Sequence, residues 1–195
     1  MPVEIEIKLR VTDLDSTRDA IAHLGYRIHH QRTLERNAVF DTSDATLRAS
    51  GHLLRLRTFG NTSTITFKGD SIEGRHKQRE EIEVNVSDAD NAALIFQRLG
   101  FSPTFRYEKF RTEYTNPGAP GIITVDETPI GNFLELEGPG SWIDDIASRL
   151  GYRESDYIKL SYGALYIEHC SSTGTPPGDM LFPLRPTFDR SAKLP

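Results

Sequence analysis

Cysteine is almost absent from this sequence of 195 residues, because Cys170 is the only one. A single cysteine cannot form a disulfide within the chain, which excludes a small secreted domain held by disulfides. No apolar run approaches the roughly 20 residues that a helix needs to cross a bilayer. The start, residues 1–4, lacks the apolar stretch of a signal peptide. We therefore expect a cytoplasmic protein with no membrane segment.

An excess of positive charge is also missing. The formal net charge is −5 at pH 7, whereas a general nucleic-acid binder needs a basic surface. The basic residues alternate with acidic ones, which would repel a phosphate backbone. The six histidines form no HExxH or other metal-binding spacing. We expect no nucleic-acid partner, and at this length one domain is the default.

The most informative stretch is Glu4-Ile5-Glu6-Ile7-Lys8, in which charged and apolar residues alternate without a break. Successive side chains of a strand point to opposite faces of the sheet. The three charged side chains therefore share one face, and the isoleucines share the other. For one strand alone, a solvated polar face is the commoner explanation of such a pattern.

The same alternate spacing of charges recurs along the chain, and this repetition favours a binding site over a solvated face. The repeats are Arg55/Arg57, Arg79/Glu81/Glu83, Lys109/Arg111 and Glu135/Glu137. Several strands that present charges of both signs on one face predict a site built from the sheet itself.

The chain divides into two halves of similar pattern. Each half shows a strand, a helix that ends in Leu-Gly-aromatic (Leu24-Gly25-Tyr26 and Leu99-Gly100-Phe101), and then three strands. This similarity predicts an internal duplication with two pseudo-symmetric halves. Because a barrel has no open edges, eight such strands favour an α+β fold, a closed eight-stranded antiparallel β-barrel with flanking helices.

Local patterns give more detailed expectations. A strand begins at Tyr26 and a separate one spans Arg36 to Asp41. The charged, glycine-containing segment from Asp70 to Lys77 is typical of a loop. A last helix is expected from Asp156 to Cys170, which would place Lys159 beside Asp156.

The C-terminal segment differs in composition from the rest of the chain. Residues 171–195 are rich in Ser, Thr, Gly and Pro, which is typical of a linker. Two alternatives are open: the segment is disordered, or it packs on the domain through Met180, Leu181 and Phe182. We expect a tunnel domain over residues 1–170 and a Pro-rich tail over residues 171–195.

The inward-facing groups nearly balance in charge. The carboxylates are Glu4, Glu6, Glu81, Glu83, Asp126, Glu135 and Glu137, and the bases are Lys8, Arg36, Arg55, Arg57, Lys68, Arg79, Lys109 and Arg111. Clustered carboxylates suit hard divalent cations such as Mg²⁺ or Mn²⁺. Clustered Arg and Lys suit phosphate oxygens. A complex of a metal with a polyphosphate would satisfy both sets.

The same residues resemble the CYTH superfamily, also called triphosphate tunnel metalloenzymes, which includes class IV adenylyl cyclases, thiamine triphosphatases and inorganic triphosphatases. Glu4-x-Glu6-x-Lys8 is similar to the family's ExExK signature. The later motifs follow in the family's order: Arg36 before Phe40-Asp41-Thr42, Leu54-Arg55-Leu56-Arg57, Thr66-Phe67-Lys68, Arg79-x-Glu81-x-Glu83, Lys109-x-Arg111, Val125-Asp126, Gly131-x-Phe133-Leu134-Glu135-Leu136-Glu137-Gly138, then Lys159 and Ser161-Tyr162. The resemblance covers roughly residues 3–168.

This resemblance implies a role for each matching residue. The implied metal ligands, for Mg²⁺ or Mn²⁺, are Glu4, Glu6, Asp126, Glu135 and Glu137. The implied phosphate-binding residues are Lys8, Arg36, Arg55, Arg57, Lys68, Arg79, Lys109, Arg111 and Lys159. The residues expected to carry the reaction are Glu4, Glu6, Lys8, Lys68, Glu81 and Glu83.

Two reactions fit this set of residues. The first is metal-dependent hydrolysis of inorganic triphosphate or of a small organic triphosphate such as thiamine triphosphate. The alternative is a class IV-type adenylyl cyclase, which converts ATP to cyclic AMP and pyrophosphate. No clear base-reading constellation accompanies the motifs, so we favour the triphosphatase. A module that only binds polyphosphate or nucleotide is the third interpretation, and the question of a homodimer is open.

Overall fold

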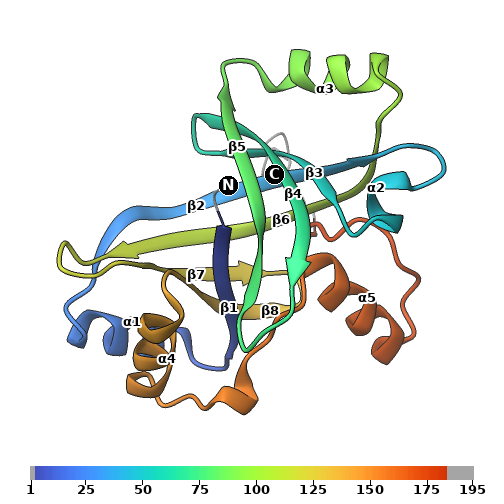
Figure 1. The fold of residues 1–195 in the computed structure, drawn as a ribbon. Helices are drawn as coiled ribbons and strands as arrows, with labels where there is room; N and C mark the ends of the chain where they lie inside the picture. The colour runs from blue at the N-terminus through green and yellow to red at the C-terminus, as the bar shows by residue number, and fades with distance from the viewer. Residues whose placement is uncertain (1–2, 184–195) are drawn as a thin grey trace, which may run out of the picture.

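The computed structural model describes residues 3–183, whose strands close into one antiparallel barrel (Figure 1). Around the barrel the order is β1-β5-β4-β3-β2-β6-β7-β8. The strands are β1 (Val3–Val11), β2 (Arg27–Asp41), β3 (Leu53–Phe59), β4 (Thr62–Ile72), β5 (Lys77–Val86), β6 (Ser102–Thr115), β7 (Ile122–Thr128) and β8 (Gly131–Glu137). The helices are α1 (Leu14–His23), α2 (Thr46–Ala49), α3 (Ala89–Arg98), α4 (Gly140–Arg149), the 3₁₀ helix η1 (Glu154–Asp156) and α5 (Tyr162–Thr173).

The strand order confirms the predicted pseudo-symmetry of the two halves. Exchanging β1–β4 for β5–β8 leaves every neighbour relation in the barrel unchanged. The halves meet where β5 pairs with β1 and β4, where β1 pairs with β8, and where β2 pairs with β6. Each half begins with a strand and a helix, β1 with α1 and β5 with α3. The barrel interior is thus lined by equivalent strands from both halves.

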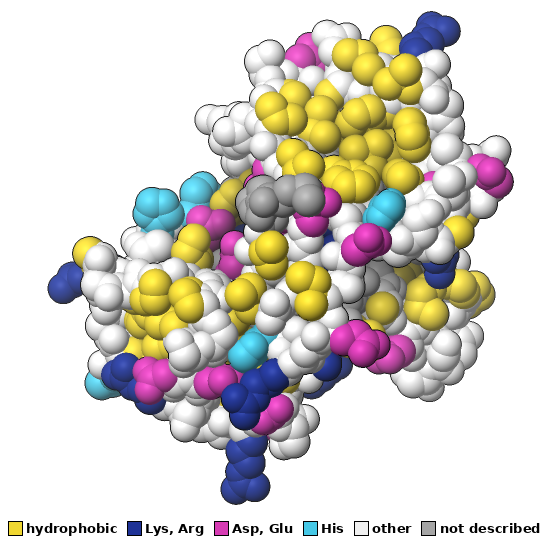
Figure 2. All heavy atoms as spheres, in the orientation of Figure 1, with side chains coloured by type: hydrophobic (Ala, Val, Ile, Leu, Met, Phe, Trp, Pro, Cys, Tyr) yellow, Lys and Arg dark blue, Asp and Glu magenta, His cyan; other side chains and the backbone are white. Residues whose placement is uncertain are grey.

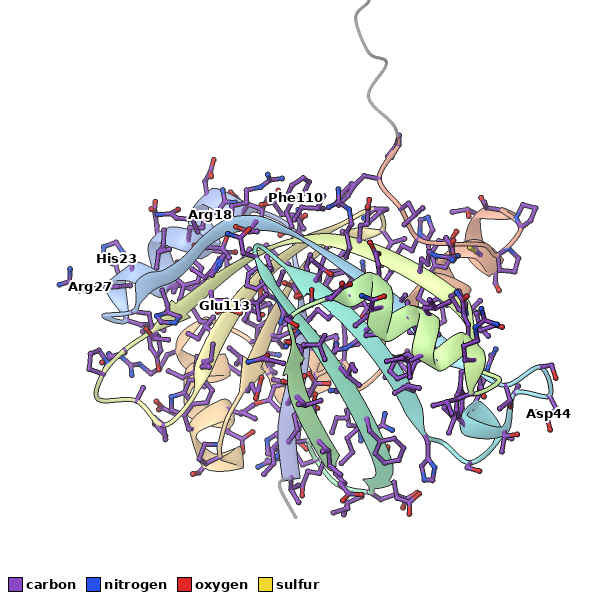
Figure 3. All side chains as sticks on the ribbon, turned by 90° about the horizontal axis from the view of Figure 1, so that it is seen from above. Arg18, His23, Arg27, Asp44, Phe110 and Glu113 are labelled. Atoms are coloured by element: carbon purple, nitrogen blue, oxygen red, sulfur yellow. The ribbon has the colours of Figure 1, made fainter. Side chains whose placement is uncertain are left out.

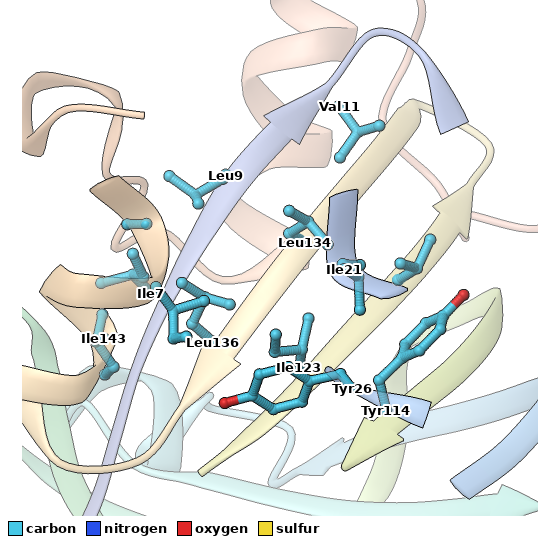
Figure 4. Packing of buried hydrophobic residues seen from close by; sticks show 13 residues of the cluster. Ile7, Leu9, Val11, Ile21, Tyr26, Tyr114, Ile123, Leu134, Leu136 and Ile143 are labelled. Atoms are coloured by element: carbon cyan, nitrogen blue, oxygen red, sulfur yellow. The ribbon is translucent and has the colours of Figure 1, made fainter. Parts of the chain in front are cut away.

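The outer faces of β1, β7 and β8 form the main hydrophobic core (Figure 4). Ile7 and Leu9, which alternate with the charged residues of β1, are completely buried against α1 and α4. Their fully buried partners include Ile21, Ile123, Leu134, Leu136 and Ile143. Because burial of each such side chain contributes about 1.5–3 kcal/mol, this face fixes which side of β1 points inward.

The three Leu-Gly-aromatic sequences end helices α1, α3 and α4 in the same way. Gly25, Gly100 and Gly151 have φ values of 85°, 92° and 87°, in the left-handed region that glycine adopts at little cost. In each case the following aromatic amide donates to a carbonyl five residues earlier, as Tyr26 does to Ile21 at 3.3 Å. The glycine therefore turns the chain back onto the barrel after each helix.

Helix α3 covers a second part of the barrel, against β2, β3 and β4 (Figure 3). Ala92 of α3 is buried with Phe40 and Leu56. The neighbouring surface is apolar, and Figure 2 shows a broad hydrophobic patch in the region of α3 and β5. Exposed apolar side chains on these two elements include Ile82, Val84, Leu94 and Ile95.

The last helix begins at Tyr162 rather than at Asp156, so the predicted start was wrong. The cause is the backbone of Ile158, which pairs with Lys8 of β1 through two hydrogen bonds of 2.9 Å. This pairing keeps the segment extended until Ser161 caps the helix by accepting from the amide of Ala164. Lys159 therefore does not lie on a helix beside Asp156.

Of the two alternatives for the C-terminal segment, packing holds as far as residue 183. Met180 is 1% exposed, and its amide and carbonyl bond the β6 backbone at Arg106 and Glu108, both at 2.9 Å. The ring of Phe182 lies 5.1 Å from that of Phe110, whereas Leu181 is exposed. The remainder of the predicted tail, 184–195, lies outside the described residues.

Two connections differ from the expected ones. Strand β4 continues to Ile72 through a register shift between Lys68 and Ser71, so the loop before β5 spans only residues 73–76. Strand β2 is one long element rather than two, with irregular pairing to β6 between Ile28 and Thr33. Both irregularities are β-bulges, which bend a strand without ending it. In the described part of the chain, no helix has the length and apolar character to span a membrane.

Candidate functional site

The alternation of charged residues places them in a cavity of about 510 Å³ inside the barrel. Most of the side chains around it are charged, which is the reverse of a folded protein's ordinary interior. The lining residues are Val3, Glu4, Glu6, Lys8, Leu53, Arg55, Arg57, Lys68, Lys77, Arg79, Glu81, Glu83, Tyr107, Lys109, Arg111, Glu113, Ile122, Thr124, Glu135, Glu137, Ser161 and Tyr162.

One wall of the cavity, made by β1 and β8, is rich in carboxylates. Glu6 lies directly opposite Glu137 in the strand pairing, and Lys8 lies opposite Glu135. The Lys8 ammonium separates the acids, at 3.1 Å from Glu135 and 3.4 Å from Glu6. Like charges this close repel one another unless cations lie among them.

The opposite wall, made by β3 and β4, is basic. Arg55 and Arg57 follow one another on the inner face of β3, and Lys68 lies on β4. Their partners are the β5 carboxylates: Arg55 and Arg57 lie 3.3 Å and 3.4 Å from Glu83, and Lys68 lies 2.8 Å from Glu81. Lys68 also reaches across to Glu4. This wall supplies two guanidinium groups side by side, the arrangement that suits phosphate oxygens.

A third cluster surrounds Asp126 of β7, next to the cavity residues Lys109, Arg111 and Tyr162. Asp126 has no exposed surface. Its carboxylate accepts from Lys109 at 2.7 Å, from Arg111 at 2.7 and 2.6 Å, and from the Tyr162 hydroxyl at 2.7 Å. The ammonium of Lys109 also lies 3.5 Å from the buried Glu35. Both carboxylate oxygens of Asp126 therefore accept hydrogen bonds, and Asp126 is not among the residues that line the cavity.

The carboxylates of the cavity divide by environment. Burial opposes the ionised form of Glu6, but the charges of Lys8 and Lys77 outweigh it and hold the pKa of Glu6 well below its usual range. Partial burial, and then the charges of Glu4, Glu6 and Glu135, raise the pKa of Glu137 to about 7 although its side chain keeps contact with solvent.

Glu81 behaves like Glu137. Burial, and then a hydrogen bond with Glu4, raise the pKa of Glu81 to about 8. Two neighbouring carboxyl groups that share a proton are a recurrent arrangement at functional sites. Glu4 and Glu81 thus share one base, Lys68, and Glu137 has no base within 4 Å among the described residues, so negative charge is least neutralised around these carboxyl groups.

The donor set of the acidic wall fits a hard divalent cation. Glu4, Glu6 and Glu137 offer carboxylate oxygens, the ligands that Mg²⁺ and Mn²⁺ prefer. Within residues 3–183, no ammonium or guanidinium group lies within 4 Å of Glu137, and burial together with its acidic neighbours raises its pKa. No three acidic, Cys or His side chains of the described part already surround one point. A cation bound there would take oxygens that now accept from Lys68 and Lys77.

Three residues expected in the phosphate-binding set lie elsewhere or are otherwise engaged. Arg36 lies on the outer face of β2, with its side chain 65% exposed and 3.2 Å from Glu108. Lys159 is exposed and donates to the carbonyl of Gly74 at 2.9 Å. Arg79 lines the cavity, but its guanidinium donates to backbone carbonyls, among them that of Lys68 at 3.0 Å.

The remaining expected residues do meet in the cavity: Glu4, Glu6, Lys8, Arg55, Arg57, Lys68, Glu81, Glu83, Lys109, Arg111, Glu135 and Glu137. The inward residues that were missed include Glu35, Asn37, Lys77 and Glu113. A signal for the first two was present, because Ala38 and Phe40 share the outer, apolar face with Arg36 and so place the odd-numbered neighbours inside. Lys77 was assigned to a loop, which hid its alternation with Arg79.

Comparison with known proteins agrees with this geometry. The family model of the CYTH domain matches residues 2–148. A proposed adenylate cyclase of Methanocaldococcus jannaschii is 30% identical over 170 residues, covering 82% of this chain and 96% of that protein. The adenylate cyclase CyaB of Aeromonas hydrophila is 29% identical over 173 residues, covering 83% of this chain and 87% of its own length.

A solved structure shares the fold. It is a proposed adenylyl cyclase from Hippeastrum with a dominant triphosphatase activity, with a TM-score of 0.63 and 17% identity, covering 87% of this chain and 96% of that one. CYTH proteins are enzymes that act on triphosphate substrates such as ATP, and they are in general metal-dependent. The CYTH family model matches most of this chain, and the closed barrel and the charged cavity agree with that match. This chain therefore belongs to the CYTH family.

Proposed function

We propose that this chain hydrolyses a triphosphate in a metal-dependent reaction, with inorganic triphosphate or a small organic triphosphate such as thiamine triphosphate as the substrate. The observation that carries the proposal is the division of the cavity into an acidic wall on β1 and β8 and a basic wall on β3 and β4. A polyphosphate chain with a bound cation has the same division of charge. Water is the attacking group, and the terminal phosphoryl group is transferred.

The basic wall would hold the substrate. Arg55 and Arg57 present guanidinium groups that bind phosphate oxygens in pairs, and Lys8 and Lys68 present ammonium groups from two sides of the cavity. These groups neutralise charge on the equatorial oxygens and keep the chain in line with the attacking oxygen. Positioning of this kind accounts for most of the catalysis of phosphoryl transfer.

The acidic wall would hold the metal through Glu4, Glu6 and Glu137. When bound, a divalent cation supplies a Lewis acid for the phosphoryl oxygens and a means of orienting them. Glu135 contacts Lys8 and Arg111 and so fixes both of these bases. We place Asp126 outside the ligand set, because four short hydrogen bonds occupy it; it would hold Lys109 and Arg111 in position.

Cyclisation of ATP is the second candidate, and it is favoured by the names of the two relatives that share 30% and 29% of their residues with this chain. The cyclase reaction needs a place for adenine, which usually combines an apolar slot with amide or backbone partners. The uncharged part of the cavity lining consists of Val3, Leu53, Tyr107, Ile122, Thr124, Ser161 and Tyr162, and no side-chain amide is among these residues. For this reason we rank hydrolysis first.

A product assay tests the proposal. Purified protein is given inorganic triphosphate, thiamine triphosphate or ATP, each with Mg²⁺ and with Mn²⁺, and products are resolved by phosphorus NMR. We expect orthophosphate from a triphosphate, and a rate lower by on the order of 10²-fold in Glu6→Gln. Cyclic AMP and pyrophosphate from ATP would establish the second candidate instead. Binding without turnover of any of the three would contradict both.

A further inference from the structure

Lys77 is a cavity lysine that the family resemblance in the sequence did not include. It is the first residue of β5 and pairs in register with Glu6 of β1. Its side chain is 14% exposed, lines the cavity, and places its ammonium on the Glu6 carboxylate. Glu6 therefore holds two ammonium groups, those of Lys77 and Lys8.

The three lysines that contact Glu4 and Glu6 differ in what else they contact. Lys8 also lies 3.1 Å from Glu135, and Lys68 also lies 2.8 Å from Glu81. For Lys77, Glu6 is the one carboxylate partner among the residues that the structure describes. A cation that takes the oxygens of Glu6 would leave Lys8 and Lys68 with a partner each, and Lys77 with none.

The neighbouring residue limits how far Lys77 can withdraw. His76, the residue before β5, is buried and lies 2.9 Å from Asp144 of α4. Arg75 also contacts Asp144, at 2.9 Å, and Lys159 donates to Gly74 at 2.9 Å. These contacts hold the loop of residues 73–76 against α4 and the segment before α5. The backbone beside Lys77 is therefore held at the edge of the cavity when Glu6 changes partner, and the Lys77 side chain remains within reach of a ligand there.

An ammonium that is enclosed and has lost its counter-ion is costly, and a nearby anion relieves that cost. We propose that Lys77 couples metal binding to triphosphate binding: it occupies Glu6 before the metal arrives and then binds a phosphate oxygen of the substrate. This inference rests on the proposed function. It predicts that metal and triphosphate each raise the affinity of the cavity for the other, with Lys77 as a carrier of that coupling.

Isothermal titration calorimetry tests the proposal. The ligands are Mn²⁺ and diimidotriphosphate, an inorganic triphosphate analogue that resists hydrolysis. In Lys77→Gln we expect Mn²⁺ alone to bind several-fold more tightly, because a competing ammonium is gone. The factor by which Mn²⁺ strengthens diimidotriphosphate binding should fall by about tenfold. Lys77→Arg should retain most of the coupling. Arg98→Gln, which removes one exposed positive charge at the end of α3, is the matched control and should behave as wild type.

The outcomes separate this inference from the proposed reaction. Coupling that is lost in Lys77→Gln supports the inference even if none of the assayed triphosphates is hydrolysed. Wild-type Mn²⁺ affinity and wild-type coupling in a Lys77→Gln protein with native near-ultraviolet circular dichroism would overturn it, while hydrolysis by the wild type would still support the proposed function. If the wild-type protein did not bind Mn²⁺, the inference about Lys77 would be overturned as well.

Discussion

Glu137 is the residue through which pH should control metal binding. Partial burial, then Glu4, Glu6 and Glu135, raise its pKa to about 7, so below that pH a cation must displace a proton to bind. We expect the apparent affinity for Mn²⁺, measured by calorimetry between pH 5.5 and 8.5, to rise with pH up to about 7 and then to level. The same raised pKa means that the ionised carboxylate disfavours the metal-free fold, whose stability should fall as pH rises from about 4.5 through 7.

The control for this prediction is Glu137→Gln, which keeps the shape of the side chain and removes the titration. Its affinity for Mn²⁺ should be lower and should depend less on pH. The pKa of Glu81, raised to about 8 by burial and by Glu4, leaves a residual dependence at higher pH. An unchanged pH profile in Glu137→Gln would remove Glu137 from the metal-binding set.

At the level of single residues, most of the side chains that line the cavity could be predicted from the sequence, because successive side chains of a strand alternate between its two faces. The inward positions of Glu4, Glu6 and Lys8 follow from the apolar Ile5 and Ile7 between them, of which Ile7 is fully buried and Ile5 partly buried. The same rule was available for β2, where apolar residues place Arg36 outside and Glu35 inside. The resemblance to a family motif led to the opposite choice at Arg36. Which lysine holds which carboxylate depends on the pairing of β1 with β5, which the sequence does not reveal.

At the scale of elements, α5 is attached to the barrel through its first residue. The Tyr162 hydroxyl donates to the buried Asp126 at 2.7 Å, and its ring lies 5.2 Å from the ammonium of Lys8 and 4.8 Å from that of Lys109. We expect Tyr162→Phe to lower the free energy of unfolding by about 1–2 kcal/mol, because one hydrogen bond to a charged group is lost while Lys109 and Arg111 still satisfy Asp126.

Urea denaturation followed by circular dichroism measures this change. Tyr166→Phe is the matched control on the same helix, since its hydroxyl donates at 3.3 Å to the exposed carbonyl of Asp179. We expect a loss of less than about 0.5 kcal/mol there. Equal losses in the two variants would contradict a specific anchoring role for Tyr162.

The boundaries of elements were less predictable than their types. Gly69-Asp70 after Lys68 resembles the start of a loop, yet a bulge carries β4 past it to Ile72. The start of α5 depended on a backbone pairing between Ile158 and Lys8, two segments far apart in the sequence. In both places, pairing with another segment of the chain sets a boundary that the local composition does not define. Because the true end of β4 was missed, Lys77 was assigned to the loop.

At the scale of the whole molecule, the duplicated barrel joins two different walls into one cavity. The pairing of β1 with β5 and β8 sets the carboxylates of the first and second halves beside one another, as in Glu6 opposite Glu137. Most hydrophobic burial lies outside the barrel, against α1, α3 and α4, whereas the interior is mainly charged and has a smaller aromatic cluster of Tyr107, Phe133 and Tyr162 beside it. The metal-free protein therefore contains electrostatic repulsion that ligands would relieve.

This division predicts that ligands stabilise the fold strongly. A ligand present at 100 times its Kd adds about 2.7 kcal/mol, which for a chain of this size corresponds to a rise in Tm of about 5–10 °C. We expect that rise when Mn²⁺ and diimidotriphosphate are added together and Tm is followed by differential scanning calorimetry, with a smaller rise for either alone.

The variant Glu6→Gln distinguishes stabilisation by a cation bound in the cavity from a nonspecific effect of added salt. The variant lacks the carboxylate that pairs with Lys8 and Lys77, so its Tm without ligand should be lower than that of the wild type, and Mn²⁺ should raise it far less. Adding sodium chloride at the same ionic strength controls for screening. If Glu6→Gln showed the same response to Mn²⁺ as the wild type, the cation would be binding outside the cavity, and the charged interior would need another explanation.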